Sequence, residues 1–178
     1  MLEAAYLAGN AFSKSYVGYV HAVAHSLSGA YNVPHGVANA VLLPWVLDGY
    51  GPKIHRKLHD LAIVAGIADE NDSDSVAAAT FIRAVREMNM RFRIPRALAE
   101  IKKEDIPELA KIADAEANPL YPVPVLMSHR QLEGFYETVR AGALVPGAEK
   151  KSAREKVKAK VAGAGQEAGY MGKHAFEN

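Results

Sequence analysis

Cysteine is absent from all 178 residues of the chain. Disulfide bonds are therefore excluded, and so is any metal site that depends on thiolate ligands. A metal bound by this protein must take its ligands from histidine, aspartate or glutamate. Ligands of that kind favour iron, zinc or manganese.

The chain also lacks a large excess of charge of either sign, and it lacks long apolar runs. The chain has 21 Lys and Arg against 20 Asp and Glu, which leaves a net charge of +1. This balance predicts no strong attraction to nucleic acid or to a membrane surface. No stretch approaches the ~18 consecutive apolar residues of a membrane span, and residues 1–16 lack the basic start of a signal peptide. We therefore expect a cytoplasmic protein.

Strand-like alternation is absent, and apolar residues recur at helical spacing instead. The pattern predicts helices over residues 2–28, 37–47, 53–65, 73–91, 106–117 and 129–140. We expect the first to bend near Gly18, Pro44 to kink or interrupt the second, and Ser73 to cap the fourth. The sequence thus predicts an all-α fold, a multi-helix bundle, with residues 1–140 as one domain.

Residues 141–178 differ in composition and form a second predicted region. Pro146 and several glycines break the helical pattern, and basic residues then cluster at Lys150, Lys151, Arg154, Lys156, Lys158 and Lys160. We interpret the region as a basic tail, either flexible or helical and surrounded by solvent. An arm for nucleic acid or an acidic partner is the alternative, but no aromatic residues are interleaved with the basic ones.

Three of the seven histidines fall between residues 21 and 35. His21 and His25 are four residues apart, so a helix would place them on one face, with Cβ atoms about 5–6 Å apart. His35 follows a predicted loop and could add a third imidazole to the same ion. An ordinary helix face remains an alternative for the pair. Ala22 stands where the zinc-protease pattern HExxH has glutamate, which argues against that class.

A second histidine pair, His55 and His59, has the same spacing but a different setting. Lys53, Arg56 and Lys57 surround it in sequence. Positive charge opposes the binding of a cation, so we predict that both histidines lie on an exposed helix face. His129 is predicted to open a helix at the surface.

The residues around the first histidine pair resemble a known family. The run GNAFSKSYVGYVHAVAHSLSGAYNVPHGVANAVLLPWVL, residues 9–47, is similar to the signature region of iron-containing (group III) alcohol dehydrogenases. It includes the AF-S segment, the HxxxH pair, the PHG step and the ANAxLLP run. Residues 94–113 and 117–139 are also similar to the C-terminal half of these enzymes, so the resemblance covers about residues 1–140.

The resemblance implies a helical C-terminal domain that holds a divalent metal, iron first and zinc as the alternative. In the family an N-terminal α/β domain binds NAD(P), and one Asp and three His bind the metal. The matching positions imply His21 and His35 as metal ligands. They imply His25 as the catalytic histidine that also faces the nicotinamide, and Phe12 as a substrate-pocket residue. Simple core packing is the alternative for Phe12.

The family's Asp and its first His precede the segment that this chain matches, and the sequence shows no dinucleotide fingerprint. We therefore expect the metal-binding domain of an alcohol dehydrogenase, truncated or split, and inactive alone. Its expected partner is the NAD(P)-binding domain, a companion chain or a second copy. The alternatives are a non-catalytic helical interaction module and, ranked last, a small hydrolase, because no carboxylate lies within the histidine cluster of the sequence.

Overall fold

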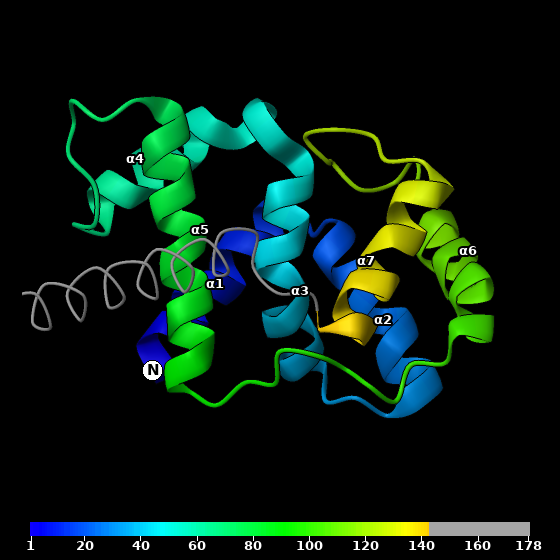
Figure 1. The fold of residues 1–178 in the computed structure, drawn as a ribbon. Helices are drawn as coiled ribbons and strands as arrows, with labels where there is room; N and C mark the ends of the chain where they lie inside the picture. Colours follow the sequence, from blue (N-terminus) through cyan, green and yellow to red (C-terminus); the bar gives the residue numbers. More distant parts are fainter. Residues whose placement is uncertain (143–178) are drawn as a thin grey trace, which may run out of the picture. The chain divides into compact units, whose positions relative to one another are not determined.

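The computed structural model describes residues 1–142, and every regular element in that range is helical, which confirms the predicted all-α fold. Of the tail predicted over residues 141–178, residues 143–178 lie outside the described part of the chain, and Ala141 is the last residue of α7. Figure 1 shows the elements, which in chain order are α1 (Leu2–Ser15), α2 (Tyr19–Tyr31), α3 (His35–Tyr50), the 3-10 turn η1 (Gly51–Ile54), α4 (His55–Val64), α5 (Asp74–Arg91), the 3-10 turn η2 (Lys103–Asp105), α6 (Ile106–Ala117) and α7 (His129–Ala141).

The larger core lies among α2, α3, α6 and α7. Helix α2 packs against both α3 and α6, and α6 packs against α7. The fully buried side chains at these contacts include Tyr19, Leu27, Leu42, Leu132 and Val139. Ala110, Ala113 and Ala117 of α6 are also fully buried. Such small side chains allow the two helix backbones to approach closely, which sets α6 firmly beside the histidine-bearing helix α2.

Helices α4 and α5 pack against each other and form a second, smaller core from Ile54, Leu58, Ala78 and Ile82. This pair joins the main bundle through contacts between α3 and α5 (Figure 1). At that junction the Arg86 guanidinium lies 4.9 Å from the ring centroid of Trp45 and forms an ion pair with Asp48. A cation–π contact of this kind reinforces the apolar packing around it.

Several helices begin and end where the local chemistry predicts. The Ser73 hydroxyl accepts a hydrogen bond from the Val76 amide at 3.4 Å, so the predicted cap of α5 is confirmed. Ser128 and Gln131 form a capping box at the start of α7. Gly142 ends α7 with a φ of 61°, a left-handed conformation that glycine adopts without steric cost.

The helix predicted over residues 2–28, with a bend near Gly18, is in fact two helices that are separated at that point. The chain forms α1 and α2 with a break at residues 16–18, where Tyr16 has a φ of 62° and Gly18 caps α2. A residue with a positive φ and an extended ψ cannot continue an α-helix, so the chain changes direction at Tyr16. In contrast, α3 runs continuously through Pro44 and begins at His35, two residues before the predicted start.

Helix α1 has little packing of its own. None of its residues is buried, and its exposed large apolar side chains are Leu2, Tyr6, Leu7 and Phe12. A helix of about 14 residues is marginal in water without tertiary packing. Among residues 1–142, no helix has the combination of length and apolar character needed to cross a membrane.

Candidate metal centre and adjoining pocket

The structure brings the three predicted site histidines together. His21 and His25 lie on α2, and His35 is the first residue of α3. The ring centroids are 5.9 Å apart for His21 and His25, 5.3 Å for His21 and His35, and 5.1 Å for His25 and His35. Asn32 ends α2 in the left-handed conformation, with a φ of 53°, and this short turn returns the chain to the same side of the bundle.

His21 is set up to remain neutral. Burial lowers its pKa below the ordinary histidine value, and the neighbouring His35 and His25 rings lower it further. The Glu116 carboxylate acts in the opposite direction but is the weakest of these influences. A neutral imidazole is the form that binds a metal, because it keeps a lone pair on one ring nitrogen.

His25 is held by a carboxylate from a distant part of the chain. Its Nδ1 lies 2.7 Å from Glu116 Oε1, and the Tyr121 hydroxyl donates to the same oxygen at 2.6 Å. No carboxylate lies within the histidine cluster of the sequence, but the fold brings one to it from α6. Nδ1 is therefore occupied by a protein partner.

His35 contacts Asn39, one helical turn further along α3. Asn39 Nδ2 lies 2.8 Å from His35 Nε2 and also donates to the His35 carbonyl oxygen at 3.1 Å. A histidine ligand commonly uses one ring nitrogen for the metal and the other for a hydrogen bond that orients the ring. In this contact the Asn39 amide is the donor, so His35 Nε2 accepts the bond and the N–H of a neutral ring lies on Nδ1. A metal at His35 would therefore bind Nε2 in place of the Asn39 amide.

The donor set present fits two of the four ligands implied by the family resemblance. His21 is kept neutral, and the His21 and His35 rings are close enough to share an ion. Within residues 1–142, no group of three or more His, Asp or Glu side chains is arranged to hold a metal ion. The described part of the chain therefore offers an incomplete imidazole site.

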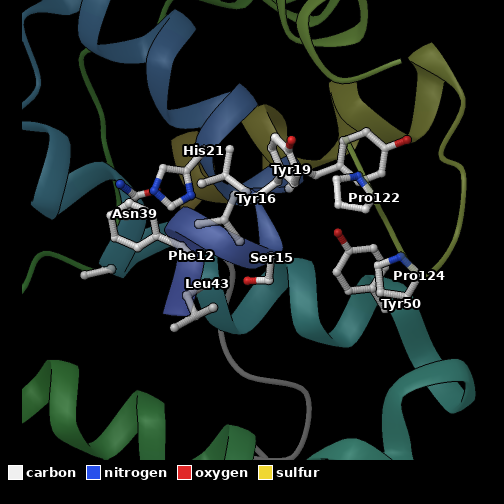
Figure 2. A pocket seen from close by; sticks show the side chains of 14 residues that line it. Phe12, Ser15, Tyr16, Tyr19, His21, Asn39, Leu43, Tyr50, Pro122 and Pro124 are labelled. Carbon is white, nitrogen blue, oxygen red and sulfur yellow. The ribbon is translucent and has the colours of Figure 1, made fainter. Parts of the chain in front are cut away.

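A pocket with a volume of about 470 Å³ adjoins His21. Figure 2 shows Phe12, His21 and Asn39 on one side of it, and Tyr50, Pro122 and Pro124 on the other. The Phe12 and His21 ring centroids are 6.4 Å apart, and Phe12 is 50% exposed, so its side chain belongs to the pocket and not to the buried core. His25 and His35 are not among the lining residues.

The prediction for the second histidine pair is wrong at His59. His59 is only 6% exposed, whereas we expected it on an exposed face. Its side chain lies on the same side of α4 as the buried Leu58 and Ala62. The basic residues next to His59 in sequence project from other faces of the helix, so they do not indicate whether the His59 side chain is buried. His129 begins α7 and is partly exposed, as predicted.

Sequence reasoning missed Glu116, Asn39 and Tyr121. Glu116 is separated from His25 by 91 residues, so no short-range motif could join them. One signal was present: Glu116 follows Leu109 by seven residues and Ala113 by three, so it continues the buried face of α6. A charged residue at such a position often has a specific partner.

Comparison with known proteins agrees with the helical architecture. Residues 1–139 match the Fe-containing alcohol dehydrogenase family, C-terminal. Alcohol dehydrogenase 4 of Saccharomyces cerevisiae is 41% identical over 121 residues, which covers 66% of this chain and 30% of that protein. Lactaldehyde reductase of Escherichia coli is 42% identical over 110 residues, 61% of this chain and 29% of that protein.

Two solved structures also superpose on this chain. A 1,3-propanediol oxidoreductase superposes with a TM-score of 0.64 at 34% identity, over 69% of this chain and 32% of that one. An alcohol dehydrogenase from Oenococcus oeni superposes with a TM-score of 0.68 at 30% identity, over 75% of this chain and 35% of that one. This chain thus spans about 30% of the length of the curated relatives it matches. The sequence match and the superposed helical bundle together place the chain in the Fe-containing alcohol dehydrogenase family, within its C-terminal region.

Proposed function

We propose that this chain is the metal-binding domain of an iron-dependent, NAD(P)-linked alcohol dehydrogenase, which oxidises alcohols or reduces aldehydes when complete. The observation that carries the proposal is the meeting of His21 and His35, with ring centroids 5.3 Å apart, beside a pocket that His21 lines. A metal position next to an apolar pocket is the arrangement that a small alcohol requires.

Each site residue has a separate role in this proposal. His21 and His35 hold the metal through neutral imidazoles, with iron as the first candidate and zinc as the second. The bound metal supplies Lewis-acid polarisation, and NAD(P) supplies the hydride chemistry. His25 accepts or returns the hydroxyl proton at its free ring nitrogen and faces the nicotinamide. Phe12 packs against the carbon chain of the substrate.

The proposal includes a partner. Two imidazoles without a carboxylate form a weak site, because a divalent ion takes much of its affinity from negative ligands. We propose that an α/β domain supplies the remaining ligands and the NAD(P) site, either on the same polypeptide or as a companion chain. Residues 1–178 alone are then expected to bind metal weakly and to lack dehydrogenase activity.

A binding experiment tests the metal assignment. The chain is titrated with Fe(II) without oxygen, and separately with Zn(II), by calorimetry. We expect a single weak site that His21→Ala and His35→Ala each abolish. His25→Ala should retain the metal site, because His25 Nδ1 is already hydrogen-bonded to Glu116. His129→Ala is the matched control, since this partly exposed histidine also lies on a helix.

Two results would overturn the assignment. Metal binding that survives His21→Ala together with His35→Ala would place the metal elsewhere. Oxidation of simple alcohols with NAD(P) by the pure 178-residue chain would contradict the need for a partner domain.

Helix α1 supports a second candidate function, a non-catalytic interaction module. Its exposed apolar side chains, Leu2, Tyr6 and Leu7 among them, offer a surface for another chain or a second copy. Light scattering with a metal assay separates the candidates. A stable oligomer without bound metal, dispersed by Tyr6→Ser with Leu7→Ser, would favour the interaction module. A monomer whose metal binding depends on His21 would favour the dehydrogenase domain.

A further inference from the structure

Glu116 is the only carboxylate in hydrogen-bond contact with the histidine cluster among the described residues 1–142. Its Oε1 lies 2.7 Å from His25 Nδ1, a distance typical of a hydrogen bond between an imidazole and a carboxylate. The Glu116 side chain is 28% exposed, so water competes only partly for this oxygen. An ionised carboxylate only accepts hydrogen bonds, so the proton of this bond lies on Nδ1.

The position of Glu116 is fixed by the packing of α6 against α2. Ala113 and Ala117, on either side of it, are fully buried. Directly after α6, Asn118 Oδ1 accepts a hydrogen bond from the Tyr19 hydroxyl at 2.8 Å, and Tyr19 lies at the start of α2. Both helices are thus joined close to the Glu116–His25 contact, and the carboxylate is held at a set distance from the ring.

Tyr121 strengthens the arrangement from the other side. Its hydroxyl donates to Glu116 Oε1 at 2.6 Å. This hydrogen bond, with some burial, raises the pKa of Tyr121 to about 12, so the tyrosine remains a neutral donor at physiological pH. Two donors therefore converge on one carboxylate oxygen, which orients the carboxylate as well as the imidazole.

We propose that Glu116 is a positioning residue for His25, which it holds as the Nδ1–H tautomer so that Nε2 remains the basic nitrogen. No other hydrogen bond to the His25 ring is present among the described residues. The His35 ring stacks against His25 at an interplanar angle of 23° and can support the ring plane, but it does not select a tautomer. The choice of tautomer therefore falls to Glu116.

The consequence for catalysis rests on the proposed function. A histidine that relays a hydroxyl proton needs one nitrogen free of hydrogen, and a partner on the other nitrogen fixes which one. Loss of Glu116 would leave His25 with a mixture of tautomers and of ring orientations. Only part of the molecules would then present Nε2 as a base.

The test is long-range ¹H–¹⁵N NMR of the complete chain with ¹⁵N-labelled histidine, at a pH where His25 is neutral. We expect His25 in the native chain to be mainly Nδ1–H, and Glu116→Ala to move it toward the Nε2–H form. Tyr121→Phe should retain Nδ1–H, because the carboxylate remains. Glu108→Ala is the matched control: Glu108 is an exposed glutamate of the same helix, and its ion pair is with Lys111.

Two results would overturn the proposal: a native His25 that is mainly Nε2–H, or a tautomer that is the same in Glu116→Ala and in the native chain. Circular dichroism checks that each variant is folded, and Glu116→Leu, which also removes the carboxylate, gives a second comparison if Glu116→Ala is unstable. A tautomer lost in Tyr121→Phe but kept in Glu116→Ala would assign the role to Tyr121 instead. The measurement uses no metal, substrate or NAD(P), so its failure is distinct from failure of the dehydrogenase proposal.

Discussion

The side-chain amide of Asn89 donates a hydrogen bond to the main-chain carbonyl of Ala40 at 2.6 Å. Pro44 stands four residues after Ala40 in α3 and has no N–H to offer that carbonyl. Asn89, on α5, therefore supplies the partner that the helix itself lacks. This hydrogen bond accounts for the absence of the interruption that the sequence offered as one alternative at Pro44.

We predict that Asn89→Ala lowers the free energy of unfolding by about 1 kcal/mol, because the Ala40 carbonyl loses its donor. The same change should cost less in a Pro44→Ala background, where the helix regains its own N–H donor. Urea unfolding of the two single variants and the double variant measures this coupling. Equal costs in both backgrounds would mean that Asn89 acts independently of Pro44.

Gly49 and Gly134 form a matched pair of helical glycines. A Cβ on Gly49 would lie 2.8 Å from Phe135 Cζ, whereas a Cβ on Gly134 would meet nothing within 4 Å. We predict that Gly49→Ala destabilises the chain by about 1–3 kcal/mol through overpacking. Gly134→Ala should stabilise it by about 0.5–1 kcal/mol, because alanine is the better helix former. Thermal unfolding of both variants should show midpoints that move in opposite directions.

The Tyr136 hydroxyl, at the end of a fully buried side chain, donates to the Leu109 carbonyl at 3.0 Å and lies 2.6 Å from Ser26 Oγ. We predict that Tyr136→Phe costs about 1–2 kcal/mol in urea unfolding, because both partners lose a contact in the core. Ser26→Ala should cost less, since Tyr136 keeps its bond to Leu109. The opposite order would show that the Ser26 hydroxyl, and not the tyrosine, organises this contact.

We predict that the folded chain loses stability at alkaline pH because Tyr50 ionises. Burial raises its pKa in the folded chain to about 12, above the ordinary value of 10.0, although a hydrogen bond from the Tyr19 main chain partly opposes the shift. The stabilisation from a neutral Tyr50 is thus complete below pH 10 and is lost as the pH rises through about 12.

The measurement is urea unfolding at about pH 9 and about pH 11.5. The native chain should lose more stability between these values than Tyr50→Phe, which has no hydroxyl to ionise at this position. Tyr6→Phe is the control, because Tyr6 is exposed on α1. An identical alkaline loss in native chain and Tyr50→Phe would contradict the prediction.

The sequence predicted most of the helices because their apolar spacing, caps and glycines are local signals. Ser73 and the start of α5 are examples. The sequence indicated a bend near Gly18 but not a complete break at Tyr16, since a positive φ at a tyrosine depends on the packing around it and not on its own preference. The interruption that was one alternative at Pro44 does not occur, and the donor that pairs with the Ala40 carbonyl comes from Asn89, in another helix.

Part of the candidate site could also be predicted from local sequence signals, and part depends on the folded structure. His21, His25 and His35 lie within fifteen residues, so helical spacing and the family resemblance identified them together. Glu116 reaches His25 only because α6 packs on α2, and that contact follows from the folded bundle. The burial of His59 was missed because its neighbours in sequence occupy other faces of α4.

Phe12 and His21 line the same pocket, but the helices that carry them differ in how far they are buried. His21 lies on α2, whose Tyr19 and Ala22 are fully buried in the main core, whereas α1 buries none of its residues. The His21 side of the pocket is therefore held in place by the main core of the bundle. In the proposed dehydrogenase, the width of the pocket at Phe12 would depend on what packs against α1, and the preference for small or large alcohols would depend on it too.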